Sequence, residues 1–180
     1  MPYLLIAVIV VVLLIVVWII SVSNKLNRAI VKIEEADSGI DVALTKRYDV
    51  LTKMIEVVKS YAKHEKETLF EVINLRAGMT TEEKMAANNK MSANFDKINV
   101  LAESYPELRS SENYKTLQQS IVEVEEHLQA ARRMFNSNVS IFNQMIVTFP
   151  TSVIASSKGL TKKDFFEAEE AKKQDVKMDL

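Results

Sequence analysis

The chain has 180 residues, 23 Lys and Arg against 24 Asp and Glu, and no cysteine. Disulfides and thiolate chemistry are therefore excluded, and the balanced charge provides no field that would recruit nucleic acid, so no nucleic-acid partner is expected. With only three glycines and three prolines, the composition favours long helices and an all-α fold.

The first predicted element is an apolar run at residues 3–20, without a charge, a glycine or a proline. As a helix it would measure about 27 Å, close to the roughly 30 Å hydrocarbon core of a bilayer. A signal peptide is the alternative, but no basic residue precedes the run, an h-region is only about 7 to 15 residues long, and no Ala-x-Ala follows. We predict an uncleaved transmembrane anchor at residues 1–23, with residues 3–20 in the lipid bilayer.

Basic residues flank only the C-terminal side of this run, at Lys25, Arg28 and Lys32. Lys and Arg mark the cytoplasmic side of a membrane segment. The protein is therefore predicted to cross the cell membrane once, with its N-terminus outside and residues 24–180 in the cytoplasm as one helical domain.

Two apolar stripes with helical spacing follow; the first ends at Leu44 and the second begins at Leu51. Nothing breaks the helical pattern cleanly between residues 24 and 77, and one helix of that length would measure about 80 Å. A turn is therefore expected near Arg47 to Leu51, with Asp49 as its local support.

The later boundaries have clearer signals. Gly78 can take the left-handed conformation that closes a helix, and Thr80 with Glu83 forms a capping box that would open the next one. Tyr105 and Pro106 should end that helix, because proline lacks an N–H donor and clashes with the preceding turn.

Ser110 or Ser111 is predicted to cap a long helix that Pro150 terminates. Apolar residues recur along it in steps of three and four from Tyr114 to Phe149, which is heptad packing typical of a coiled coil, and only Asn138 interrupts the series. A last short helix through Phe165 and Phe166 could be capped by Thr161 and Asp164.

Residues suited to catalysis are scarce. His64 and Glu65 begin like a zinc-protease helix, but Thr68 stands where the second imidazole should be, and His127 is the only other histidine. The three glycines are isolated, so no phosphate loop is present. We expect no catalysis, no cofactor and no metal.

Several stretches share an order and a spacing with a known family. Residues 46–49 read KRYD, residues 57–62 VVKSYA, residues 105–108 YPEL, residues 131–150 ARRxFNxxVxxFNxxxxxFP, and the C-terminal part contains DFFE and ends in KMDL. This pattern resembles the LemA family of small, mostly bacterial membrane proteins.

The resemblance implies an N-terminal transmembrane helix followed by an antiparallel, up-and-down four-helix bundle with a short C-terminal helix, and no assigned enzymatic activity. The chain departs from the family pattern at Thr52 and Val176, where family members often have proline. The first departure weakens the expected turn after Arg47.

An uncharged segment extends from Met134 to Ser157. It is either the central bundle helix, covered by residues 156–180, or a contact to the bilayer surface or to a membrane partner. With a turn near Arg47, this segment would lie on a fourth helix that returns toward the lipid. Without that turn, the segment would point into the cytoplasm, away from the lipid. The candidate interaction or structural residues are Arg132, Asn136, Asn138, Asn143, Phe149 and Pro150.

Two of these candidates carry specific expectations. Asn138 either rotates outward or hydrogen-bonds across to a neighbouring helix. Asn136 and Asn143 lie on one face and should each bond a backbone or side-chain group along a half-buried strip.

Two functional hypotheses follow. The first is a membrane-anchored interaction or scaffold module with an unidentified protein partner. The alternative, suggested by the LemA resemblance, is a regulatory accessory of a membrane enzyme such as an HtpX-type zinc protease in envelope stress.

Overall fold

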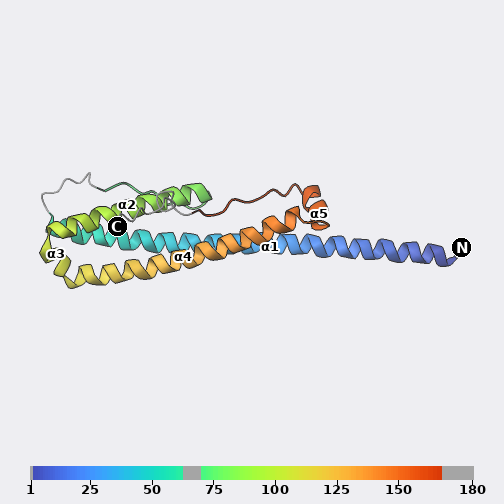
Figure 1. The fold of residues 1–180 in the computed structure, drawn as a ribbon, viewed down its shortest axis with the longest axis horizontal. Helices are drawn as coiled ribbons and strands as arrows, with labels where there is room; N and C mark the ends of the chain where they lie inside the picture. Colours follow the sequence, from blue (N-terminus) through green and yellow to red (C-terminus); the bar gives the residue numbers. More distant parts are fainter. Residues whose placement is uncertain (1, 63–69, 168–180) are drawn as a thin grey trace, which may run out of the picture. The chain divides into compact units, whose positions relative to one another are not determined.

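The computed structural model describes residues 2–62 and 70–167 (Figure 1). These residues form five α-helices: α1 (Pro2–Tyr61), α2 (Thr81–Ser104), α3 (Pro106–Ser110), α4 (Glu112–Val147) and α5 (Thr151–Ser157). No strand occurs in the described part of the chain, which confirms the all-α prediction. The zinc-protease-like His64 and Glu65 and the C-terminal KMDL lie outside the described residues.

The turn predicted near Arg47 to Leu51 is wrong, because α1 continues through it as one helix of 60 residues. The buried positions of α1 keep a spacing of three or four residues without a change of phase: Ile33, Ala36, Ile40, Ala43, Arg47, Leu51, Met54 and Val58. The core position between the two apolar stripes is occupied by arginine, so a search for apolar residues alone finds a gap where the packing has none.

The structure divides into two compact units. Unit 1 comprises Met1–Asp37 and Met134–Asp164, and unit 2 comprises Ser38–Arg133 and Phe165–Leu180. The predicted domain boundary after residue 23 stays a prediction.

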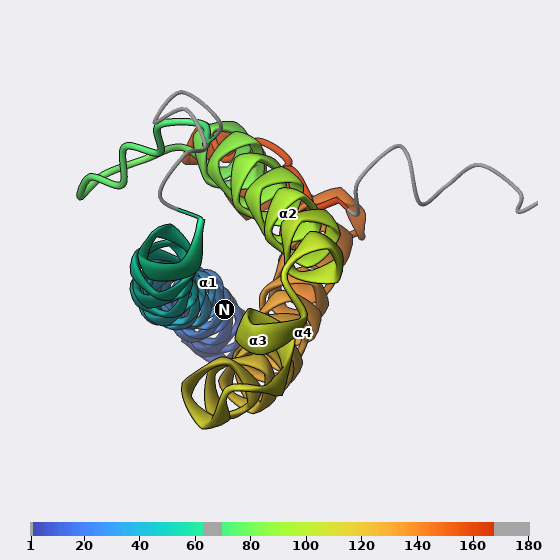
Figure 2. The same cartoon turned by 90° about the vertical axis from the view of Figure 1, so that its left-hand side faces the viewer.

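In unit 2, α2 packs beside α1, and α4 completes the group (Figure 2). Asp41 pairs with Lys84, and Arg47 contacts Asn88 and Ser92, so the residue numbers rise together along α1 and α2. The two helices therefore run in the same direction, and the up-and-down order of the predicted four-helix bundle is not confirmed. The core of this unit contains Leu51, Met54, Val58, Met91, Phe95, Ile98, Leu108 and Tyr114.

Several helix boundaries are confirmed. Thr80 and Glu83 form the predicted capping box at the start of α2, and α2 ends at Ser104, just before Tyr105. The Ser111 hydroxyl accepts a bond from the Tyr114 amide at 3.3 Å where α4 begins, so Ser111 is the cap. α4 ends at Val147, three residues before Pro150.

Two other boundary predictions are wrong. Gly78 has the expected positive φ of 74°, but it lies in a turn between non-helical residues and ends no helix. Residues 160–167 contain no helix, so Thr161 and Asp164 cap nothing there. The short helix is instead α5, which begins directly after Pro150 and lies within the uncharged segment.

The apolar segment of α1 belongs to unit 1, and its side chains from Tyr3 to Ile20 are all exposed. α1 is long and apolar enough to cross a membrane by length and composition, and none of its apolar window is buried by the rest of the structure. Exposing Val, Ile and Leu side chains to water over this length is unfavourable, whereas lipid accommodates them. This fits a membrane protein.

Candidate functional site

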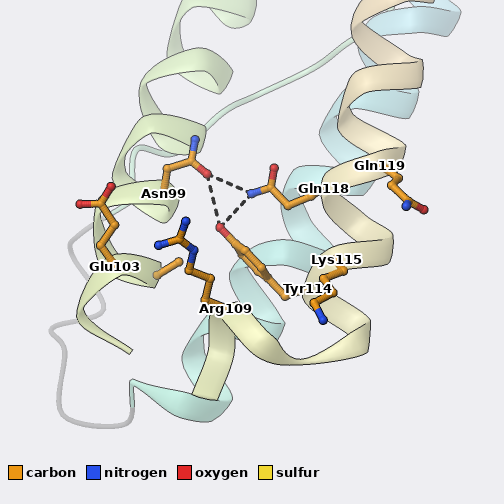
Figure 3. Close-up of a pocket in the computed structure, with 8 residues that line it drawn as sticks. Asn99, Glu103, Arg109, Tyr114, Lys115, Gln118 and Gln119 are labelled. Carbon is orange, nitrogen blue, oxygen red and sulfur yellow. Dashed lines mark hydrogen bonds between the residues drawn. The ribbon is translucent and has the colours of Figure 1, made fainter. Parts of the chain in front are cut away.

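A cleft of about 510 Å³ opens in unit 2 where α2, α3 and α4 meet (Figure 3). Its lining residues are Asn99, Ala102 and Glu103 from α2, Arg109 from α3, and Tyr114, Lys115, Gln118 and Gln119 from α4. Amides and a phenol line it together with two cations and one carboxylate. The cleft therefore offers both hydrogen-bond donors and hydrogen-bond acceptors.

Three of these side chains hold one another in place (Figure 3). Gln118 donates from Nε2 to the Tyr114 hydroxyl at 2.8 Å and to Asn99 Oδ1 at 3.0 Å. The Tyr114 hydroxyl donates to Asn99 Oδ1 at 3.3 Å. The Tyr114 side chain is otherwise buried, with its ring in the core of unit 2, so its hydroxyl stands at a fixed position in the cleft.

The local sequence explains how the cleft forms. Pro106 stops α2 and occupies the first position of α3, where its missing N–H donor costs nothing. Leu108 is fully buried and anchors α3 in the core. Ser111 ends α3 and caps α4, so the chain reverses within a few residues and brings Tyr114 opposite Asn99.

A second polar group in unit 2 surrounds Arg47, which is 7% exposed. Its guanidinium donates to the Asn88 side chain, to the Asn88 carbonyl at 3.3 Å and to Ser92 Oγ at 3.1 Å, and it pairs with Glu125 at 3.2 Å. It also lies over the Phe95 ring, 5.4 Å from the centroid. These contacts pair the charge of a buried cation, so we assign Arg47 a structural role.

Lys84 is a second buried cation, with 2% of its side chain exposed and its Nζ 2.6 Å from Asp41 Oδ1. The carboxylate is half exposed, so this pair lies at the edge of the interior. Together with Arg47 it fixes the register of α1 against α2. Neither cation contributes to the cleft lining.

Among the residues singled out from the sequence, Asn138 and Asn143 lie in unit 1 and make specific bonds. Asn138 is half-buried and donates from Nδ2 to the Lys32 carbonyl on α1 at 3.0 Å, which is the predicted bond across to a neighbouring helix. Asn143 is half-buried and bonds both backbone groups of Lys163, donating at 2.8 Å and accepting at 2.9 Å.

The other predicted residues have different roles. Asn136 is half-buried in unit 1, as expected for the strip that it shares with Asn143. Arg132 belongs to unit 2, where its guanidinium lies 4.9 Å from the centroid of the buried Phe166 ring. Phe149 and Pro150 are exposed in unit 1, and Phe149 keeps 79% of its surface accessible.

The sequence analysis missed both the Arg47 group and the cleft. Arg47 was part of the KRYD motif, and its place in the heptad spacing was the available signal. Asn99, Gln118 and Tyr114 come from two helices, and no spacing along the chain connects Asn99 to α4. Among the described residues, no three His, Cys, Asp or Glu side chains are grouped so that they could hold a metal ion.

Comparison with known proteins gives the family. The model of the LemA family matches residues 36–180, which is most of the chain. The chain belongs to the LemA family. Protein LemA of Metamycoplasma hominis is 29% identical over 158 residues, which cover 85% of this chain and 72% of that protein.

A shorter likeness connects this LemA protein to magnetosome proteins. The magnetosome protein MamQ of Magnetospirillum gryphiswaldense is 26% identical over 70 residues, 39% of this chain and 26% of that protein. MamQ 2 of Paramagnetospirillum magneticum is 27% identical over 75 residues. The chain spans only about a quarter of these relatives, so the likeness is limited to that part of their sequences.

Proposed function

We propose that this LemA protein is a membrane-anchored interaction module whose cleft in unit 2 docks a segment of a partner protein. The observation that supports the proposal most is the hydrogen-bonded group of Asn99, Tyr114 and Gln118 in that cleft. These side chains are neutral donors and acceptors held by one another, which is suited to binding peptide groups and unsuited to nucleophilic chemistry. The apolar segment of α1 supplies the membrane anchor.

The charges around the cleft suggest the chemistry of the docked segment. Arg109 lies between Glu103 and Tyr114, and Lys115 lies on the other side of Tyr114 (Figure 3). A partner segment with an exposed backbone and an acidic residue beside Arg109 would satisfy both the amides and the cations. No observation favours the alternative, in which the protein regulates a membrane zinc protease.

Photocrosslinking in cells tests the proposal. A photoreactive amino acid at Gln119, which lines the cleft, is compared with one at Glu123, which is exposed on the same helix outside it. We expect one partner to be captured from Gln119 and not from Glu123, and its capture to fall when Tyr114→Phe removes the hydroxyl. Equal capture from both positions, or capture that Tyr114→Phe leaves unchanged, would overturn the cleft as the docking site. A membrane protease as the captured partner would support the alternative.

A further inference from the structure

Basic residues outnumber acidic ones in the part of unit 1 that follows the apolar segment. Residues 21–33 and 134–163 contain no Asp or Glu, although the whole chain has 24 acidic and 23 basic residues. The six basic residues of these two stretches are Lys25, Arg28, Lys32, Lys158, Lys162 and Lys163. Glu34, Glu35, Asp37 and Asp164 follow these stretches within unit 1, so the part of unit 1 after the apolar segment has a net charge of +2.

A groove of about 220 Å³ lies among these charges. Its lining residues are Lys25, Arg28, Ala29 and Lys32 from α1 and Asn138, Ile141 and Met145 from α4. The three cations are exposed on the α1 wall, and Ile141 and Met145 make the α4 wall apolar. The bond from Asn138 to the Lys32 carbonyl connects the two walls. One wall is thus suited to a phosphate and the other to hydrocarbon.

The groove begins at the outer edge of the lipid headgroup layer. At about 1.5 Å per residue, Lys25 lies about 7.5 Å beyond Ile20 and Arg28 about 12 Å beyond it. The headgroup layer is about 5 to 7 Å thick on each side of the hydrocarbon core. Helical side chains tilt toward the helix N-terminus, so both cations lean toward the apolar segment. Lys32, about 18 Å beyond Ile20, is too distant for direct contact.

A second feature of unit 1 also favours lipid. The end of α4 and α5 are together apolar enough for a membrane span by composition, but they are bent by 94° at Thr148–Pro150. Val147, Phe149 and Val153 around this bend are exposed by 58%, 79% and 57%. The Lys158 ammonium donates to Asn27 Oδ1 on α1 at 3.1 Å, so this basic residue also lies beside α1. Cations beside exposed apolar groups are typical of surfaces that bind anionic membranes.

We propose that this groove binds the headgroup of an anionic phospholipid from the bilayer that holds the anchor. Lys25 and Arg28 bind the phosphate, Lys32 adds long-range attraction, and Ile141 and Met145 form the apolar wall beside them, with Met145 against the glycerol backbone. The site lies within unit 1, and it does not depend on partner docking in the cleft of unit 2.

Fluorescence quenching on the full chain in nanodiscs tests the inference. Because the chain has no cysteine, a single fluorophore can be placed by Gln144→Cys, at an exposed position next to Met145, which lines the groove. Quenching by a minor fraction of nitroxide-labelled phosphatidylglycerol is compared with quenching by nitroxide-labelled phosphatidylcholine. We expect stronger quenching by the anionic lipid, and equal quenching by both lipids would overturn the proposal.

Charge variants show which cations act. Lys25→Gln and Arg28→Gln should each weaken the preference for the anionic lipid about fivefold, and together about 25-fold. Lys32→Gln should have a smaller effect. The control is Lys53→Gln with Lys59→Gln, which removes two exposed charges from α1 in unit 2. A preference that survives the Lys25 and Arg28 changes, or that the control pair also removes, contradicts the site.

A third pair of variants tests whether the lipid preference needs the groove or only the basic residues. Ile141→Glu puts a carboxylate on the α4 wall and should abolish the preference, whereas Val122→Glu makes the same change at a similarly exposed position of α4 in unit 2. If Ile141→Glu has no effect, the cations act without the groove and the proposal is wrong. Loss of the preference on adding free glycerol phosphate would show a soluble-phosphate site and would also overturn it. Circular dichroism confirms that each variant keeps its helices.

Discussion

Arg47 joins the three long helices of unit 2 through one side chain. It extends from α1 to Asn88 and Ser92 on α2 and to Glu125 on α4, and it stacks on Phe95. The planar guanidinium allows this, because it presents five donors in a fixed fork and can stack on an aromatic face. A cation at a core position therefore keeps α1 continuous where apolar packing alone predicts a gap.

Arg47→Lys should destabilise the protein by about 2 kcal/mol, because an ammonium group cannot contact two helices and a ring from one position. Urea unfolding of the full chain in detergent, followed by circular dichroism, measures the loss. The matched control is Arg133→Lys at an exposed position of α4, where we expect a change below about 0.5 kcal/mol. Equal effects at both positions would show that Arg47 contributes only its charge.

At the scale of elements, capping residues decide where the helices begin and end. Thr80 and Glu83 start α2, Ser111 starts α4, and the short α5 follows Pro150. Residues 160–167 contain no helix, and Asn143 holds this segment through both backbone groups of Lys163. Backbone groups that lack helical partners are thus satisfied by side chains of the neighbouring helix.

The α2 cap should make stability depend on acid pH. The Thr80 amide, which donates to the Glu83 carboxylate at 2.8 Å, holds the pKa of Glu83 below its ordinary value of 4.5. Its stabilisation is complete above that value and is lost as the pH falls through the lowered pKa, because the unfolded chain binds the proton first. Glu83→Gln keeps the capping bond and removes the titration. Its unfolding midpoint should therefore fall less than that of the parent protein between about pH 5 and pH 3.

The control for this prediction is Glu82→Gln, which removes an equal charge one residue earlier in the same turn. It should keep the acid dependence of the parent protein. If Glu82→Gln flattens the profile as much as Glu83→Gln does, general charge repulsion and not the capping bond causes the acid sensitivity.

Asn143→Ala should release the segment after α5, because the Lys163 amide and carbonyl lose their partners together. We expect faster amide hydrogen exchange across residues 160–166 and a loss of roughly 1 to 2 kcal/mol in unfolding free energy. Replacing the half-buried Asn136 as well should lower stability further. Gln144→Ala, an exposed neighbour on α4, serves as the control. Unchanged exchange in Asn143→Ala would show that other contacts hold the segment.

At the scale of the whole molecule, α1 supplies both the apolar segment and one wall of unit 2. The residues that follow α4 belong to unit 1 together with the first part of α1, although α1 has no turn. A turn in α1 was expected to be necessary to bring the end of α4 back toward the first part of α1, because each pass along the bundle was expected to be a helix. α2 runs in the same direction as α1, and the non-helical residues 71–76 run back along α2, because Glu71 bonds Asn94 and Arg76 pairs with Glu83.

The orientation of the molecule in the membrane is predicted from Lys25, Arg28 and Lys32, which follow the apolar segment. In intact cells, external protease should leave the domain uncut, and a cysteine introduced by Ser23→Cys should resist a membrane-impermeant thiol reagent. The absence of native cysteine makes any labelling specific to that position. Ready labelling of Ser23→Cys from outside would reverse the orientation.

The sequence by itself determined the features that depend on neighbours along the chain. The apolar run at residues 3–20, the cap at Thr80 and Glu83 and the break at Pro106 act over one or two turns, so local physical rules were sufficient to predict them. It also supplied the LemA pattern, but it left open whether Asn138 points outward or bonds to another helix, which the structure decided. The tertiary structure decided the rest, because hydrogen bonds between helices depend on direction and register. Only packing could show that Arg47 occupies a core position, that α2 runs in the same direction as α1, and that Asn99 meets Tyr114.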